Sequence, residues 1–400
     1  MRTPRIARRN STLGTGLALL SILGLPIVGG WIAGCQRKPP PAAPVDPLAG
    51  ARAAIQRGDI PHIRAVSMEE RSQFLGSAKC VECHKEQKIQ TTSRHARTLA
   101  RVDPKKLTPL FHAKDEVTDS LQGMTYKPAM KNGRCVIRAV SMVGSYSEEA
   151  EAEWALGSGD IGVTFLGKTN NGLTELRISN FGHGGAWDFT PGQKVGSPIK
   201  STLGQTLSQK EQVECFRCHT TALVEEGEKV LPEKSLFGVT CETCHGPGRA
   251  HVEAVSQGEK DLKMPRLQNV REHISLGLCG QCHRTPNAVM NPDDPRVQSQ
   301  LPRLQGVALS QTGCFQKGHV TCVTCHDVHQ NADDTPRQVY NQRCMSCHTA
   351  GKTDQKACPS RPTGDCVSCH MPAQEVGMPT APKFRTHWIK VWPKVVEGVS

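Results

Sequence analysis

A five-residue pattern, Cys-x-x-Cys-His, occurs seven times in this chain of 400 residues. Two thiols separated by two residues can form thioethers with the two vinyl groups of one porphyrin, and the adjacent imidazole can then bind the iron. Random placement of the chain's cysteines and histidines would give only about 0.03 copies of this pattern. The copies, numbered here as motifs 1 to 7, lie at residues 80–84, 215–219, 241–245, 279–283, 322–326, 344–348 and 366–370.

The motifs predict seven covalently attached haem c groups, with the same division of roles in each motif. The thioether-forming residues would be Cys80, Cys83, Cys215, Cys218, Cys241, Cys244, Cys279, Cys282, Cys322, Cys325, Cys344, Cys347, Cys366 and Cys369. The proximal iron ligands would be His84, His219, His245, His283, His326, His348 and His370.

Three other uses of paired cysteines fit the sequence less well. A zinc site combines two Cys-x-x-Cys pairs into four ligands and does not require a histidine after each pair. A thioredoxin-like redox centre needs only one pair on a βαβ unit. A disulfide framework suits an exported chain but gives no reason for seven following histidines.

Four cysteines lie outside the motifs, and the N-terminal one is predicted to carry lipid. Residues 1–10 hold four arginines and no acid, and an apolar run follows over about 13–32, as in an export signal. The run ends in Ile-Ala-Gly-Cys, which resembles the bacterial lipobox and makes Cys35 the acylated residue. An uncleaved membrane anchor is the alternative. Of the other three, Cys135 has no assigned role, and a disulfide between Cys314 and Cys358 is left as a hypothesis.

These features predict five segments and a largely helical fold. Residues 1–34 are a lipoprotein signal peptide, 35–60 a Pro-rich tether, 61–119 the first haem segment, 120–200 a β-rich insertion and 201–400 a hexahaem cytochrome c domain. Within the insertion, strands are expected at 135–140, 162–166 and 173–178, with a hairpin turn at 170–172. The predicted fold class is mainly α with low regular secondary structure, packed around seven haems, with a small β insertion. The insertion is expected to be a structural cover for the first haem, and a substrate-binding module is the alternative.

Nine histidines outside the motifs could supply distal iron ligands. Seven six-coordinate haems need seven of them, so the supply permits bis-histidine ligation throughout. Methionine is an alternative axial ligand, with Met264, Met290 and Met378 available.

Several stretches carry a family resemblance. Residues 79–85 with 93–96, and the sequence Gly-Val-Thr-Cys-Glu-Thr-Cys-His-Gly-Pro-Gly-Arg-Ala-His at 238–251, resemble the tetrahaem cytochrome c-554 family. The match extends through motifs 2 and 4. Residues 322–329, 366–372 and 386–389 resemble the pentahaem nitrite reductase and hydroxylamine oxidoreductase group.

The resemblance implies specific distal ligands. It favours His95, His251, His329 and His387, and leaves His62, His112, His183, His273 and His319 open. Carried over, His95 would bind the haem on His245, and His251 the haem on His84. The resemblance also implies an open iron face on the haem of His219, which His112, His183 or His273 could close.

The predicted function is electron relay by a lipid-anchored heptahaem cytochrome c on the periplasmic side of the membrane. Bis-histidine ligation leaves no iron position for a substrate. The alternative is an oxidoreductase acting on a small nitrogen or sulfur oxyanion, or on NO, at one five-coordinate haem. Expected partners are redox proteins or quinol-linked membrane donors. The net charge of +12 would suit nucleic acid, but export excludes that partner, and haem propionates account for the surplus of cations.

Overall fold

The structure is a computed structural model that describes residues 49–112, 114–182, 185–197, 201–284, 301–348, 358, 364–376 and 382–392. The signal segment, Cys35 and the tether up to residue 48 lie outside these residues, as do His183, Met290 and Met378. Among the described residues, no helix is long and apolar enough to span a membrane.

The described helices are short, because most of them are single turns built around a motif or a cap. The α-helices are α1 (Ala49–Gln56), α2 (Met68–Arg71), α3 (Ser77–Cys80), α4 (Pro104–Leu107), α5 (Gln209–Arg217), α6 (Cys241–His245), α7 (Arg249–Ser256), α8 (Glu272–His283), α10 (Gln305–Ser310), α11 (Gly313–Gly318), α12 (Cys322–Cys325), α13 (Arg337–Met345) and α14 (Cys366–His370). The 3-10 helices are η1 (Lys85–Thr92), η2 (His95–Arg97), η3 (Thr108–Leu110), η4 (Pro232–Lys234), η5 (Leu301–Arg303) and η6 (Ala332–Asp334).

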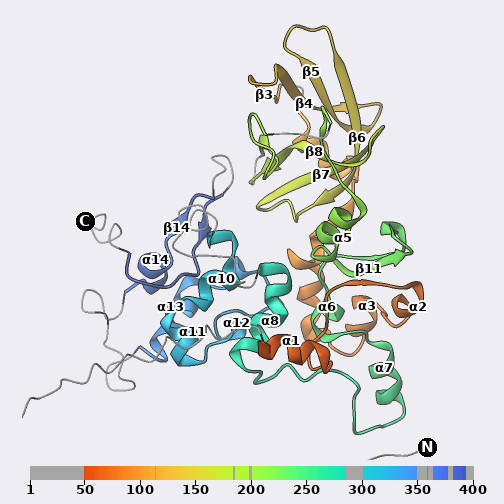
Figure 1. Cartoon of the computed structure of the whole chain (residues 1–400). Helices are drawn as coiled ribbons and strands as arrows, with labels where there is room; N and C mark the ends of the chain where they lie inside the picture. Colours follow the sequence, from red (N-terminus) through yellow and green to blue (C-terminus); the bar gives the residue numbers. More distant parts are fainter. Residues whose placement is uncertain are drawn as a thin grey trace, which may run out of the picture. The chain divides into compact units, whose positions relative to one another are not determined.

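A curled antiparallel sheet of nine strands dominates the segment between motifs 1 and 2 (Figure 1). Its main order is β10-β8-β7-β6-β5-β4-β3, with β2 paired to β6 and β9 paired to β8. The strands are β2 (Leu99–Arg101), β3 (Val117–Asp119), β4 (Met124–Lys131), β5 (Arg134–Ser141), β6 (Ser147–Leu156), β7 (Gly162–Thr169), β8 (Gly172–Phe181), β9 (Ala186–Phe189) and β10 (Gly204–Thr206).

Two smaller sheets accompany the motifs. In the first, β1 (Ala65–Val66) runs parallel to β11 (Thr220–Glu226), which also pairs with β12 (Lys229–Val230) and β13 (Leu236–Phe237). The second pairs β14 (Ala373–Gln374) with β15 (Phe384–Arg385).

The predicted fold class, mainly α with a small β insertion, is wrong. The structure has 35% helix and 25% strand, and its largest element is the nine-stranded sheet. The three strands expected at 135–140, 162–166 and 173–178 are present, and so is the hairpin that joins the last two. The sheet is larger than expected because several of its strands, such as β6, have sequences with helix-favouring composition.

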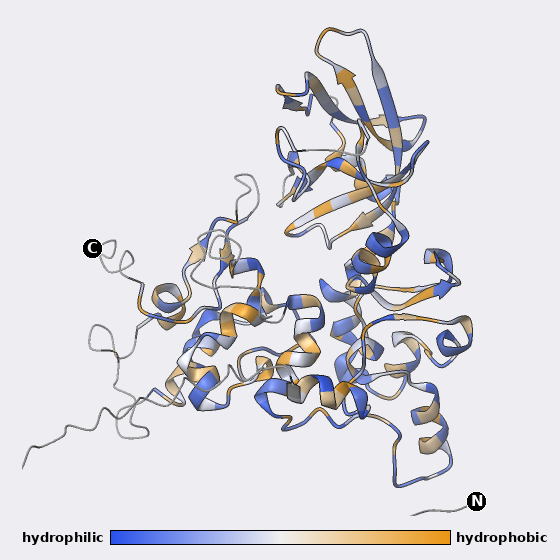
Figure 2. Ribbon diagram, in the orientation of Figure 1, coloured by the Kyte–Doolittle hydropathy of each residue, from blue (hydrophilic) through white to orange (hydrophobic). Residues whose placement is uncertain are grey.

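Alternation of side chains explains why β6 is a strand. Ala150, Ala152 and Trp154 face the interior, while the glutamates between them face outward. In Figure 2, hydrophilic and hydrophobic residues interleave along the strands of the sheet. Side chains alternate between the two faces of a strand, so the Ala and Trp side chains are buried on one face while the Glu side chains stay on the other. This burial outweighs the intrinsic preference of Ala and Glu for helix.

The interior of the sheet holds an aromatic cluster. Phe111, Phe165 and Trp187 have ring centroids 5.2 to 5.7 Å apart, and the Trp187 indole donates to the Leu110 carbonyl at 2.9 Å. Centroid distances in this range are favourable for aromatic pairs. The sheet therefore has a hydrophobic core of its own.

A second apolar cluster joins the sheet to motif 2. Leu99, Trp154 and Leu166 of the sheet pack with Phe216 of α5 and Leu223 of β11. The Trp154 ring meets the Phe216 ring edge-on at 6.0 Å between centroids. The insertion was predicted to cover the first haem, whereas these contacts place it against the helix of motif 2.

Asp119→Ala is expected to lower the free energy of unfolding by about 3–5 kcal/mol. Asp119 and Arg177 form an ion pair of 2.6 Å with both side chains fully buried. Removing the carboxylate leaves a buried guanidinium without its counter-charge. Urea unfolding of the whole protein, followed by far-ultraviolet circular dichroism of the sheet, measures the change.

Glu149→Ala is the matched control, because it removes an ion pair with Lys131 in which both side chains remain exposed. Exposed pairs contribute about 0–1 kcal/mol. Equal losses in the two variants would contradict the role given to the buried pair.

Candidate functional site

Motifs 3, 5 and 7 form single helical turns, and their own sequences explain why. Motifs 2, 4 and 6 lie at the C-terminal ends of the longer helices α5, α8 and α13. In motifs 3 and 5 a threonine precedes the first cysteine, and a second threonine lies three residues later, forming a capping box. In motif 7, Asp365 caps the backbone N–H of Ser368. A side-chain oxygen at this position satisfies N–H groups that the first helical turn leaves free. The turn brings two thiols and one imidazole to the same place.

Several imidazoles of the predicted site donate their Nδ1–H to the protein. His219, His251 and His370 donate to the carbonyls of Thr98, Leu262 and Lys390 at 2.8 to 2.9 Å. Longer contacts of 3.3 to 3.4 Å join His283, His326 and His387 to the oxygens of Gln305, Tyr340 and Arg385. An imidazole held in this way presents Nε2 to a metal, which is the usual arrangement of ligating histidines.

Four motif histidines each face one histidine from outside the motifs. The centroid distances are 6.5 Å for His84 and His251, 5.9 Å for His283 and His95, 6.4 Å for His245 and His329, and 6.0 Å for His326 and His387. These rings are too far apart for direct van der Waals contact. Two metal–nitrogen bonds of about 2 Å, plus half of each ring, give roughly 6 Å between centroids. The spacing therefore fits one metal ion between each pair.

The four facing histidines are the four that the family resemblance favoured as distal ligands. His251 lies opposite His84, as the resemblance implies. His95 lies opposite His283 and not opposite His245, so the pairing carried over for His95 is wrong. His245 instead faces His329, with the two rings almost parallel at 6°.

The other motif histidines, His219, His348 and His370, have no imidazole opposite them among the described residues. The structure describes four further histidines outside the motifs, and none of them faces a motif imidazole. His112 is exposed, His319 pairs with Glu272 at 3.3 Å, His273 lies against Gly50, and His62 lies near Arg64 and Arg217.

Burial lowers the pKa of both His95 and His387 to about 4, from an ordinary value of 6.5. A ligating imidazole must be unprotonated, so both changes favour metal binding. In the unfolded chain these groups bind protons from about pH 6.5 downward, but in the folded protein only near pH 4. Protonation therefore favours unfolding as the pH falls through this window, and stability rises with pH across it.

Thiol contacts show which motifs are neighbours. Cys80 of motif 1 hydrogen-bonds with Cys241 of motif 3. In the same way Cys218 of motif 2 contacts Cys282 of motif 4, and Cys279 of motif 4 contacts Cys322 of motif 5. The contact with Cys282 lowers the pKa of Cys218, and the contact with Cys80 lowers the pKa of Cys241, while the pKa of each partner thiol is raised. Thiolate is the reactive form of cysteine in addition chemistry.

Motif 4 has the most neighbours. Cys244 of motif 3 interacts electrostatically with both of its cysteines, and motifs 2 and 5 contact it through the thiols described above. From motif 5 the contacts lead on to α13, which enters motif 6, because Arg343 of that helix donates to the carbonyl of Cys325. Asn341 of the same helix accepts from the backbone N–H of Val367 in motif 7 at 3.2 Å. These contacts give the order 1-3-4-5-6-7, with motif 2 beside motif 4. Thr221, which follows motif 2, also hydrogen-bonds with Thr243 of motif 3 at 3.1 Å, and His245 of motif 3 faces His329, which follows motif 5.

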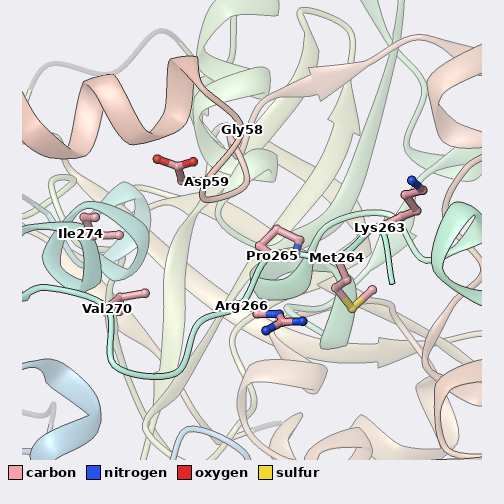
Figure 3. A pocket seen from close by; sticks show the side chains of 8 residues that line it. All are labelled: Gly58, Asp59, Lys263, Met264, Pro265, Arg266, Val270 and Ile274. Carbon is pink, nitrogen blue, oxygen red and sulfur yellow. The ribbon is translucent and has the colours of Figure 1, made fainter. Parts of the chain in front are cut away.

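A hollow of about 490 Å³ lies beside the segment that orients His251 (Figure 3). It is within the size range of ligand pockets, about 300–1,000 Å³. The thioether of Met264, one of the methionines considered as an axial ligand, lines this hollow together with Arg266. The carbonyl of Leu262 accepts the hydrogen bond from His251, and Leu262 immediately precedes Lys263 and Met264, which line the hollow.

Two of the alternatives for the cysteines can be compared with the structure. The structure shows no disulfide between Cys314 and Cys358, and the predicted bond between them stays a hypothesis. Within the described residues, no group of three or more His, Cys, Asp or Glu side chains is arranged to hold a metal ion. The spacing of the imidazole pairs and their Nδ1 hydrogen bonds fit iron held between two histidines.

Comparison with known proteins gives one match. Residues 181–246, which include motifs 2 and 3, match the family model described as cytochrome c554 and c-prime. No curated protein and no solved structure matches the chain. The match supports a c-type cytochrome, that is, an electron-transfer protein with covalently bound haem c.

Proposed function

We propose that this protein is a heptahaem cytochrome c that relays electrons through largely bis-histidine haems. The observation that carries the proposal is the set of four imidazole pairs, each with one motif histidine and one histidine from elsewhere in the chain. When bound, each haem iron would take up and release one electron. The residues of this chain would hold the irons on both faces and leave these four without a site for substrate.

Burial and hydrogen bonding of the ligands support relay as the role. His387 and His95 are held in largely buried surroundings, and the Nδ1 contacts fix the orientation of several rings. Fixed, water-poor ligand environments reduce the rearrangement that accompanies a change of charge. Thiol contacts between motifs 1 and 3, 2 and 4, and 4 and 5 support a continuous chain of haems.

Location and partners form part of the same proposal. Acylation at Cys35 would hold the protein on the periplasmic side of the membrane. The tether would be residues 35–48, shorter than the predicted 35–60, because residues 49–56 form helix α1, in which Ala51 and Ala54 are buried. The partners would be a redox protein or a quinol-linked membrane donor. Mass analysis of the mature N-terminus tests the anchor directly, since a diacylated Cys35 at the first position supports it and an unmodified chain contradicts it.

One observation favours a second function, an oxidoreductase with a five-coordinate haem. His219 has its Nδ1 fixed by Thr98, but no imidazole faces it among the described residues. An iron held there from one side could bind NO or a small nitrogen or sulfur oxyanion. The resemblance to hydroxylamine oxidoreductase and nitrite reductase points to the same chemistry.

Electron paramagnetic resonance of the oxidised protein, with and without nitric oxide, separates the two functions. If the protein is a relay, the four paired haems should give low-spin signals that nitric oxide does not change. The same should hold for every other haem with two axial ligands. A high-spin signal that nitric oxide abolishes would favour the oxidoreductase, and comparison of His219→Ala with His348→Ala and His370→Ala would then identify the responsible motif.

A further inference from the structure

Glu242 is a buried carboxylate inside motif 3, between its two cysteines. Glu242 is only 2% exposed to solvent. Charged side chains are rarely buried so completely unless polar groups surround them. The thioether chemistry and iron ligation of motif 3 do not use this position, so its burial needs a separate reason.

Both carboxylate oxygens of Glu242 accept hydrogen bonds from backbone N–H groups. Oε1 accepts from Leu75 at 2.9 Å and from Gly248 at 2.7 Å, while Oε2 accepts from Gly76 at 2.7 Å. Because both oxygens act only as acceptors, these bonds hold the ionised form. Glu242 thereby connects its own helix to two other segments.

The first of these segments leads directly into motif 1. Gly76 precedes α3, which ends at Cys80, and no side chain of its own caps that helix. The Cys80 thiol in turn contacts Cys241, the neighbour of Glu242. The carboxylate therefore fixes the start of motif 1 against motif 3 at the place where their thiols meet.

The second segment carries the ligand that faces His84. Gly248 lies just before α7, and α7 contains His251. A Cβ atom at position 248 would come within 3.1 Å of Oε1 of Glu242, so glycine leaves room for the carboxylate. Arg249 adds two bonds from its guanidinium to the carbonyl of Ser72, at 2.8 and 2.9 Å.

We propose that Glu242 is the positioning residue that holds motifs 1 and 3 together, and that its buried charge lowers the reduction potentials of the two haems they carry. The proposal rests on the relay function described above. A fixed negative charge in a site of low polarity stabilises the ferric state over the ferrous state, because the ferric haem carries one more positive charge. The same carboxylate would thus set both the spacing and the potentials of this haem pair.

The test is spectropotentiometric titration of the haem-loaded full chain for wild type, Glu242→Gln and Glu82→Gln. Glu82 is the matched control, because it also lies between the cysteines of a motif but is exposed and paired with Lys79. In Glu242→Gln we expect the equilibrium constant for reduction of two of the seven haems to rise about tenfold or more. For one electron this raises the reduction potential by about 59 mV. Glu82→Gln should leave all centres within the error of wild type.

Electron paramagnetic resonance of the same samples reports the spacing. Glu242→Gln should change the magnetic interaction between the paired haems, and Glu242→Asp should restore the potentials in part because it restores the charge. If Glu242→Gln does not assemble, Gly248→Ala serves instead, since it displaces the carboxylate while keeping its charge, and it should change the magnetic interaction.

The outcomes separate the inference from the proposed function. Seven haems with potentials and magnetic interaction equal to those of wild type would overturn the role of Glu242 and leave the relay intact. An equal shift at all centres would also overturn it. Absence of haem from motif 1 or motif 3 in the wild-type protein would overturn the proposed function itself.

Discussion

Replacing Cys279 and Cys282 by alanine should remove one haem and leave two groups of motifs that exchange electrons slowly. Motif 4 is the junction of the chain, because it contacts motif 2 through Cys282 and motif 5 through Cys279. Without it, the thiol contacts that link motifs 1 and 3 to motifs 5, 6 and 7 are lost, and motif 3 keeps the facing pair of His245 and His329 with the segment after motif 5. Stopped-flow reduction should change from one main phase to two, with the second slower by roughly a hundredfold or more, as expected when close placement of reacting groups is lost.

The matched control removes motif 2 by Cys215→Ala and Cys218→Ala. Motif 2 lies beside motif 4 and outside the order 1-3-4-5-6-7, so its loss should cost one haem without producing the slow phase. Both variants should keep the remaining haems, as measured by haem content per chain. Identical kinetics in the two variants would contradict this order.

His329→Ala should convert one haem of the oxidised protein from low spin to high spin. The His329 ring faces His245 at 6.4 Å between centroids with an angle of 6°. Alanine leaves the iron of motif 3 with one protein ligand, and the open position then accepts water or nitric oxide. Spin quantification by electron paramagnetic resonance should give one new high-spin centre per chain.

His319→Ala is the control for this experiment. His319 is 75% exposed and pairs with Glu272, so it faces no motif histidine. Every haem that is low spin in the wild-type protein should remain low spin in this variant. An unchanged spectrum in His329→Ala, or the same new signal in His319→Ala, would show that the facing histidines are not ligands.

The chemistry of the site could be predicted from sequence because it is local. Two cysteines and a histidine within five residues must share one helical turn, whatever surrounds them. The β7–β8 hairpin could be predicted for the same reason, since the turn at 170–172 is a local signal.

The sheet and the pairing of ligands depend on contacts between distant residues. The strand β6 contains Glu and Ala at most positions, which favour helix until neighbouring strands bury Ala150, Ala152 and Trp154. His95 reaches His283 from a distant part of the chain, and no local rule selects it over His245. Glu242 occupies one of the unspecified positions of its motif, and only its three backbone partners show its importance.

Intact mass analysis of the purified full-length protein tests whether all seven motifs carry covalent haem. We expect seven haem additions per chain and no motif cysteine open to alkylation after denaturation and reduction. Fewer than seven additions, or alkylation of any of the fourteen motif thiols, would contradict this expectation.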